Sequence, residues 1–148
     1  MADMYGSILS SHFRVKDTEA FWEWLKHYSF GSCNVEFYVS DPEQKLVSFG
    51  SADAQYPSAY PQKNVYDENS EDMELEDIDI NVFAKEFCEH LQDGEIVNIV
   101  AGGNEKLRYV SFDQLVISQA HPDKPFCRSV CTDDSKEYCL SLIHGTAQ

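Results

Sequence analysis

Basic residues are scarce in this sequence, where 11 Lys and Arg stand against 26 Asp and Glu and leave a formal net charge of −15. Proteins that bind nucleic acid attract phosphates with Lys and Arg, so this balance nearly excludes direct nucleic-acid binding. Long apolar runs are missing too, since no window approaches the roughly 18 apolar residues of a membrane span. Residues 1–5 lack the basic start and apolar stretch of a signal peptide, which indicates a cytoplasmic protein.

Signatures of catalysis and of cofactor binding are also absent. The five histidines show no His-Glu-x-x-His spacing, and Gly102-Gly103 is not followed by the helix and the Lys-Ser/Thr of a phosphate loop. We therefore predict a protein that is not an enzyme and that binds no cofactor. An enzyme whose Cys–His or carboxylate pair is assembled only in the fold is the third hypothesis.

The five cysteines form an odd set without the spacing of a disulfide framework, which favours reduced thiols. A zinc site is one interpretation of the set Cys127, Cys131, Cys139 and His144. Structural zinc prefers two close pairs of ligands, and the second pair here is widely spaced. Because cysteine is among the most buried residue types, we favour thiols that fill the core.

Aromatic residues are abundant instead, with nine Phe, eight Tyr and two Trp among 148 residues. A chain of this length buries roughly two-thirds of its unfolded surface when it folds. The rings supply enough buried area to offset chain entropy, which argues against disorder throughout. Composition does not shift along the chain and no repeat is found, so we predict one domain over residues 1–148.

The first third of the chain predicts a strand, a helix and a β-hairpin. Residues 7–15 are typical of a strand, and Asp17 has the position of a helix N-cap. Apolar residues then recur with helical spacing until Gly31, which predicts an amphipathic helix; they are Phe21, Trp24, Leu25 and Tyr28. Residues 33–50 alternate around an Asp-Pro-Glu-Gln turn and predict a hairpin.

Residues 51–79 interrupt this pattern with prolines, tyrosines and then a run of acids, and we predict a long loop insert there. A second helix follows, capped by Asp79 and closed by Asp93-Gly94. The next segment, 95–101, predicts a largely buried strand, because four of its residues are Ile or Val.

The last third predicts a tight connection at 102–104, strands over 107–119 and 126–131 with a turn at 121–125, and a helix from Thr132 to Ile143. The resulting order is β-α-β-β-α-β-β-β-α, and its first six elements match a ferredoxin-like, split β-α-β arrangement. We therefore predict an α+β fold in which helices cover one face of a mainly antiparallel sheet.

The acidic run is the strongest functional signal, because residues 67–79 hold eight carboxylates and no Lys or Arg. Duplex DNA carries about one negative charge per 1.7 Å of its axis, and spaced carboxylates on a rigid scaffold can offer a similar field to a basic groove. The alternative of equal weight is a solvated, flexible loop kept for solubility. A calcium loop is disfavoured, since the run has no Gly and lacks the EF-hand spacing. The carboxylates predicted to bind a partner are Asp67, Glu68, Glu71, Asp72, Glu74, Glu76, Asp77 and Asp79.

Three tyrosines precede the acidic run and form a second candidate contact patch: Tyr56, Tyr60 and Tyr66. Tyrosine is favoured at interfaces because it combines a large area with a hydroxyl and loses little entropy. The favoured alternative is that these rings attach the loop to the domain.

Two stretches carry a resemblance to known proteins: residues 10–24 (SSHFRVKDTEAFWEW), and residues 89–97 (EHLQDGEIV) together with 105–110 (EKLRYV). They resemble small, acidic, largely uncharacterised proteins of bacterial plasmids, integrative elements and phages, over about half of the chain. The resemblance implies a mobile-element origin, where small acidic proteins are often antirestriction or anti-CRISPR factors. The 51–79 insert and the cysteine-rich end have no counterpart in that group.

Two functions follow as hypotheses of different kinds. In the first, the protein is an acidic, non-enzymatic inhibitor, a DNA mimic that occupies the nucleic-acid groove of a defence nuclease or surveillance complex in the bacterial cytoplasm. In the second, it is an interaction or immunity adaptor that binds by shape and aromatic contacts, and the acids serve solubility. Its expected partner is a basic, nucleic-acid-binding protein, with no direct nucleic acid and no membrane, and the sequence does not determine the oligomeric state.

Overall fold

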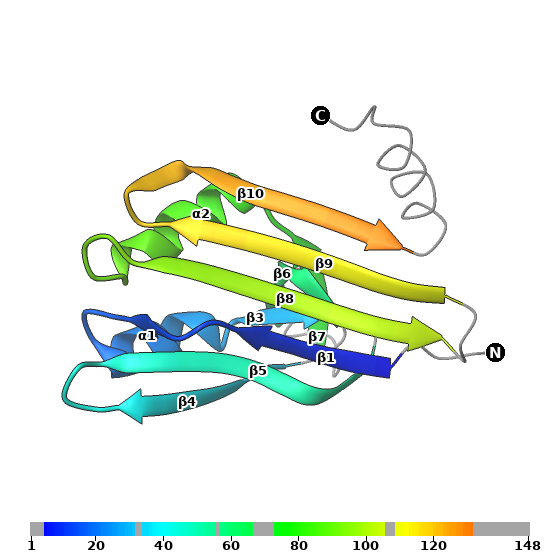
Figure 1. Cartoon of the computed structure of the whole chain (residues 1–148), viewed down its shortest axis with the longest axis horizontal. Coiled ribbons are helices and arrows are strands. Elements are labelled where there is room, and N and C mark those ends of the chain that lie inside the picture. Colours follow the sequence, from blue (N-terminus) through cyan, green and yellow to red (C-terminus); the bar gives the residue numbers. More distant parts are fainter. Residues whose placement is uncertain (1–4, 32–33, 56, 67–72, 106–108, 132–148) are drawn as a thin grey trace, which may run out of the picture.

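Two antiparallel sheets and two helices make up the residues that the computed structural model describes, which are 5–31, 34–55, 57–66, 73–105 and 109–131 (Figure 1). The large sheet has the order β10-β9-β8-β1-β5-β2, and β4 also pairs with β5. Its strands are β1 (Tyr5–Ser10), β2 (Phe13–Arg14), β4 (Glu36–Asp41), β5 (Leu46–Gln55), β8 (Ile96–Glu105), β9 (Tyr109–Ser118) and β10 (His121–Cys131). The small sheet has the order β3-β6-β7, formed by β3 (Tyr28–Gly31), β6 (Pro57–Tyr66) and β7 (Met73–Asp77).

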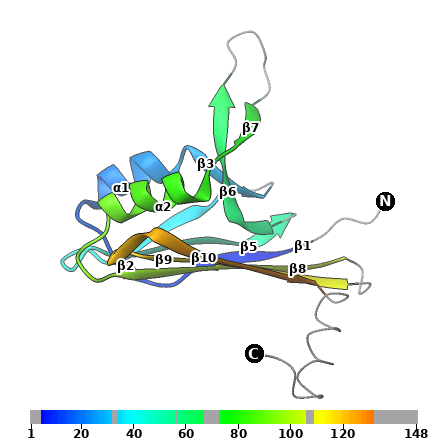
Figure 2. The same cartoon turned by 90° about the horizontal axis from the view of Figure 1, so that it is seen from above.

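Both helices, α1 (Thr18–Leu25) and α2 (Ile80–Glu89), lie on one face of the large sheet (Figure 2). Each begins at the predicted Asp cap, because the Asp17 carboxylate accepts hydrogen bonds from the backbone N–H of Glu19 and Ala20, and Asp79 accepts one from Asn81. Such caps satisfy N–H groups that have no partner within the helix. The predicted α+β class, with a mainly antiparallel sheet, is confirmed.

The core lies between the helices and the large sheet and is mostly aromatic. Phe87 of α2 packs its ring against Phe13 at 5.5 Å, Phe21 at 5.2 Å and Trp24 at 5.4 Å, measured between ring centroids. Edge-to-face and tilted contacts of this kind stabilise beyond the burial of area. This cluster joins both helices to the sheet.

The predicted end of the first helix is wrong. α1 ends at Leu25, and Tyr28 lies in β3, where it pairs with Lys63 of β6. The pairing partner is distant in the sequence, so the local helical spacing of Tyr28 could not reveal it. Tertiary pairing here overrides a weak local preference.

The loop predicted over 51–79 is also wrong, because most of its described residues belong to strands. β5 continues to Gln55, and β6 and β7 form an antiparallel hairpin in which Lys63 faces Glu76. Pro57 and Pro61 lie before Gln62, the first β6 residue that pairs with β7, so their missing N–H groups are tolerated. The hairpin projects away from the large sheet (Figure 2).

Four further predictions fail or stay open, three of them in the second half of the chain. Gly102, Gly103 and Asn104 continue β8 instead of forming a connection, and residues 121–125 belong to β10, where a register shift between His121 and Phe126 accommodates two prolines. The helix predicted from Thr132 to Ile143 lies outside the described residues. Five strands separate the two helices instead of two, so the ferredoxin-like element order is not confirmed.

Candidate functional site

The base of the β6–β7 hairpin meets the start of α2 in an acidic corner, which we define as Glu76, Asp77, Asp79 and Glu86. The first three are exposed and Glu86 is half-buried. They surround a hollow of about 310 Å³, which is also lined by Tyr28, Lys63, Ile78, Val82 and Phe83. Carboxylates at the rim and apolar or aromatic walls suit the cationic head and apolar stem of a Lys or Arg side chain.

Two of the exposed carboxylates are held by hydrogen bonds of their own. Asp77 accepts a bond from the side-chain amide of Gln62 at 2.8 Å, across the β6–β7 pair. Asp79 accepts one from the backbone N–H of Asn81 at 2.9 Å, at the N-terminus of α2. A helix N-terminus favours negative charge, so this side chain also complements the dipole of α2.

Glu86 joins the acidic corner to the aromatic core. Its Oε2 atom accepts hydrogen bonds from Trp24 Nε1 at 3.3 Å and from the Tyr28 hydroxyl at 3.1 Å. Burial, and next the neighbouring Glu86 charge, raise the pKa of Tyr28 to about 12, so this hydroxyl keeps its proton as a donor. Burial also lowers the pKa of His90, whose ring lies 5.2 Å from that of Trp24.

The structure places only part of the predicted carboxylate set. Glu76, Asp77 and Asp79 come together in the acidic corner, and Glu74 lies in β7. The predicted partner-binding residues Asp67, Glu68, Glu71 and Asp72 lie outside the described residues. Sequence reasoning missed Glu86 and Lys63, because the residues that complete the site around them are distant in the sequence.

The structure likewise places only part of the predicted tyrosine patch. Tyr60 is half-buried, and its hydroxyl is 2.6 Å from the Ser129 hydroxyl of β10, so it ties the small sheet to the large one. This contact agrees with the interpretation that the ring attaches the segment to the domain. Tyr66 ends β6, and Tyr56 lies outside the described residues.

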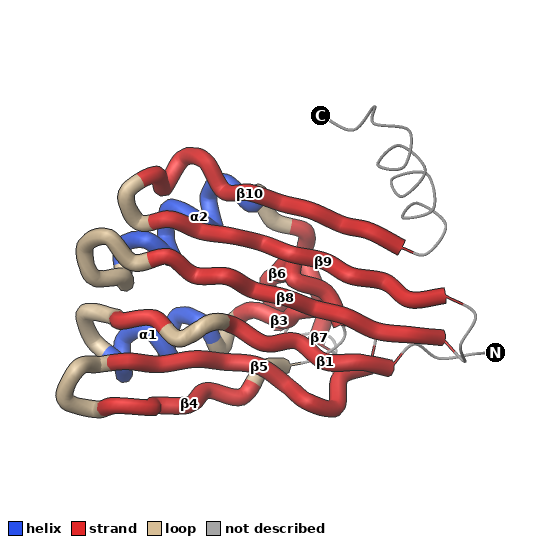
Figure 3. The backbone as a smooth tube through the Cα atoms, in the orientation of Figure 1, coloured by secondary structure: helices blue, strands red, loops and turns tan. Residues whose placement is uncertain are grey.

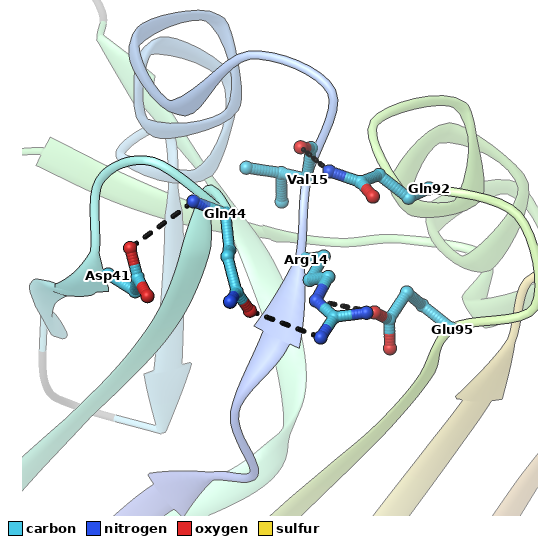
Figure 4. Close-up of polar contacts among 6 residues, drawn as sticks. All are labelled: Arg14, Val15, Asp41, Gln44, Gln92 and Glu95. Carbon is cyan, nitrogen blue, oxygen red and sulfur yellow. Dashed lines mark hydrogen bonds and ion pairs between the residues drawn. The ribbon is translucent and has the colours of Figure 1, made fainter.

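A polar network at the opposite end of the large sheet joins β2 to two turns (Figure 4). Arg14 donates to the Gln44 side chain at 3.2 Å and lies 4.0 Å from the Glu95 carboxylate. Nearby, Gln92 donates to the carbonyl of Val15 at 2.9 Å. These contacts bring residues 10–24 and 89–97 together, although the two stretches are distant in the sequence.

Arg14 is exposed, and its side-chain partners lie in the two turns. The network therefore connects β2 to these turns. It contains no nucleophilic side chain, and the hollow beside it is open to solvent. Among the residues that the structure describes, no three His, Cys, Asp or Glu side chains are grouped to hold a metal ion. Cys127 is exposed in β10, Cys131 ends that strand, and Cys139 and His144 lie outside the described residues, so the zinc interpretation stays a prediction.

Comparison of the chain with protein families, with curated proteins and with solved structures gives no match. Neither helix within the described ranges has the length and apolar character to cross a membrane.

Proposed function

We propose that this protein is an acidic, non-enzymatic inhibitor, of anti-CRISPR or antirestriction type, that acts in the cytoplasm of a bacterial host. It binds the basic nucleic-acid groove of a defence nuclease or surveillance complex. The observation that supports this most is the β6–β7 hairpin, which projects away from the large sheet (Figure 2). Its strand β7 lies within the acidic run, and Glu76, Asp77 and Asp79 at its base are exposed to solvent.

The projection of the hairpin supports this function because a projecting hairpin can enter a nucleic-acid groove, whereas a flat sheet cannot. β6 pairs with β3 on one side, and Tyr60 of β6 contacts Ser129 of β10, so the base of the hairpin is held in place. Fixed carboxylates lose little entropy when they meet cationic side chains. Opposite charge also accelerates encounter and makes binding fall steeply with salt.

The hollow beside the hairpin supplies a docking place for one cationic side chain of such a partner. Glu86 is already oriented by Trp24 and Tyr28, and the ring of Phe83 forms part of the wall. A desolvated cation beside an aromatic ring gains more than an exposed ion pair does. We expect Glu86→Gln to weaken partner binding without removing it.

A ferredoxin-like core is the fold that we propose beneath these additions. In the expected element order, the fourth, first, third and second strands lie side by side, and this chain has the antiparallel order β8-β1-β5-β4. The small sheet and the β9–β10 pair would then be extensions of that core. The hairpin is one of these extensions, which fits its absence from the resembling stretches.

The test compares two variants with the same change of charge. One carries Lys at Glu71, Asp72, Glu74 and Glu76; the control carries Lys at four exposed carboxylates elsewhere, Glu19, Glu43, Glu89 and Asp123. Tagged proteins are used to capture partners from bacterial lysate at low and high salt, with and without competing duplex DNA. We expect wild type and control to capture a nucleic-acid-binding protein that DNA displaces, and the hairpin variant to lose it. Equal capture by both folded variants would contradict the proposal.

The adaptor function is the second candidate, because apolar side chains are exposed next to the acids. Leu75 of β7 and Val82 of α2 are 41% and 53% exposed. If these residues and the tyrosines dominate binding, replacement of Tyr56, Tyr60 and Tyr66 by Ala weakens capture more than charge reversal does. Capture then also tolerates high salt.

A further inference from the structure

The large sheet has a second face, opposite the helices, which we call the open face. Its outward residues include large exposed apolar side chains: Leu9, Tyr38, Ile96, Phe112 and Phe126, between 36% and 60% exposed. Their outward direction follows from strand alternation, since Ile8, Val97, Ile99, Leu115 and Ile117 are buried on the helix side. Apolar side chains are thus exposed on several strands of this face, which makes it a candidate interaction surface.

The strand register aligns one row of residues across the whole open face, where Figure 3 shows the strands side by side. The row has Arg128 at the β10 edge and Glu36 at the β4 edge. Between them lie only uncharged residues, and the full row reads Arg128, Gln114, Val100, Leu9, Gly50 and Glu36. The opposite edges of the face therefore carry opposite charges at the same height along the strands.

We propose that the open face binds a second copy of this chain through a two-fold axis parallel to the strands, between β1 and β8. Such an axis exchanges the two edges of the sheet, so Arg128 meets Glu36 of the second copy. It also places Leu9 over Val100 of the second copy. In the neighbouring row, Phe126 and Tyr38 hold the equivalent edge positions and meet each other. Isologous contacts of this kind are the commonest route to homodimers.

The shape of the open face fits this arrangement. Leu9 is 60% exposed and stands between two hollows of about 420 and 240 Å³. The larger hollow is lined by Val100 and Gly102 among others, and the smaller by Gly50 among others. Because the axis brings Leu9 of one copy over Val100 of the other, each Leu9 enters the larger hollow of its partner.

The distribution of charge favours a second copy at this face. Two chains of net charge −15 repel each other, so they approach best where carboxylates are few. Glu36 is the one carboxylate of the central row, and it has an Arg opposite. The six strands of the open face lie about 4.8 Å apart and extend over up to about 30 Å. The face therefore has an area of roughly 700–800 Å² per copy, which is the area of a standard stable interface.

The experiment measures the dimer dissociation constant of the full chain by sedimentation velocity over a concentration series. We expect a reversible dimer for wild type. Arg128→Glu and Glu36→Arg each place like charges opposite one another and weaken the dimer about tenfold, whereas the double variant, with the charges exchanged, recovers most of the loss. Leu9→Glu, which brings a carboxylate into each hollow, weakens it about a hundredfold.

Val82→Glu is the matched control for Leu9→Glu, because Val82 is 53% exposed on α2, away from the open face. It should leave the dimer unchanged. The four-Lys hairpin variant should also still dimerise, so this proposal and the proposed function can fail separately. A wild type that stays monomeric at every concentration overturns the proposal, as does a double charge exchange that is no better than its single variants.

Discussion

The two faces of the large sheet are built from the same strands and differ sharply in what covers them. On the helix side, Phe13 and Phe49 are fully buried beneath α1 and α2. On the open face, Phe126 and Ile96 remain 55% and 57% exposed. An antiparallel sheet normally solvates its second face with polar residues, and the apolar residues here are those that the proposed dimer would cover.

The same contrast refines the prediction of a largely buried strand over 95–101. Val97 and Ile99 are buried on the helix side, whereas Ile96 is exposed on the open face. An apolar run indicates that both faces avoid water, but it does not say whether the covering group belongs to the same chain. The strand pattern is therefore as informative about association as about the fold.

The largest expected effect on the free energy of unfolding comes from removing one aromatic ring from the helix side, which we compare with removing one from the open face. Phe87→Ala leaves a cavity among Phe13, Phe21 and Trp24, and we expect a loss of about 3–5 kcal/mol in the free energy of unfolding. Phe126→Ala should cost about 0.5–1 kcal/mol in the monomer, because more than half of the residue is already exposed to water. Urea unfolding at a concentration that holds the protein monomeric measures both. Similar losses for the two variants would show that the open face is covered within one chain.

The sequence predicts the helix side well, because its signals are local. Asp17 and Asp79 cap the helices as expected, and the periodic spacing of Phe83 and Phe87 identifies the buried stripe of α2. The 36–50 hairpin was likewise predictable, since its turn residues lie between alternating strands. Local chemistry was sufficient wherever the partner residues are close in the sequence.

The small sheet was not predictable for the opposite reason. β3 pairs with β6 across about thirty residues, and the prolines and acids of that region are typical of loops. Glu86 carries no signal in the sequence either, because its donors Trp24 and Tyr28 precede it by 62 and 58 residues. Only a tertiary structure could identify the acidic corner.

The second largest effect concerns the polar link between the helix layer and the acidic corner. Glu86→Ala leaves the Trp24 N–H and the Tyr28 hydroxyl without their acceptor, and we expect a loss of about 2–3 kcal/mol. Lys85→Ala, on the exposed side of the same helix, is the control and should cost below about 0.5 kcal/mol. Thermal unfolding monitored by circular dichroism measures both. A loss for Glu86→Ala no larger than that of the control would exclude a structural role for these bonds.

The third effect is a dependence of stability on alkaline pH. The pKa of Tyr28 is raised to about 12 in the folded chain, so the folded state binds this proton more tightly than the unfolded chain does. The resulting stability is fully present below a pH of about 10 and is lost as the pH rises through about 12. We expect wild type to be about 1–2 kcal/mol more stable than Tyr28→Phe at neutral pH, with a gap that closes over this window. A constant gap would show that Tyr28 titrates normally.

A smaller effect separates the structural role of Asp79 from its charge. Asp79→Ala removes the cap of α2 and should cost about 1 kcal/mol, whereas Asp79→Asn keeps a capping oxygen and should cost only a few tenths. If the acidic corner binds a partner by charge, both variants weaken that binding similarly. The two variants should therefore differ in unfolding free energy but not in partner capture. If Asp79→Ala also loses more capture than Asp79→Asn, binding follows the stability of the helix and not the charge.

The smallest expected effect is the most decisive for the open face. Leu9→Thr should change the unfolding free energy of the monomer by less than about 0.5 kcal/mol, because Leu9 is 60% exposed and Thr is well accepted in strands. Its neighbour on the buried side, Ile8, is 1% exposed, and Ile8→Thr should cost several times more. The same Leu9→Thr change should weaken the dimer several-fold, since the hollow of the second copy loses its apolar contact. A residue that is neutral to the monomer and costly to the dimer lies in an interface, whereas one that destabilises the monomer is already part of its core.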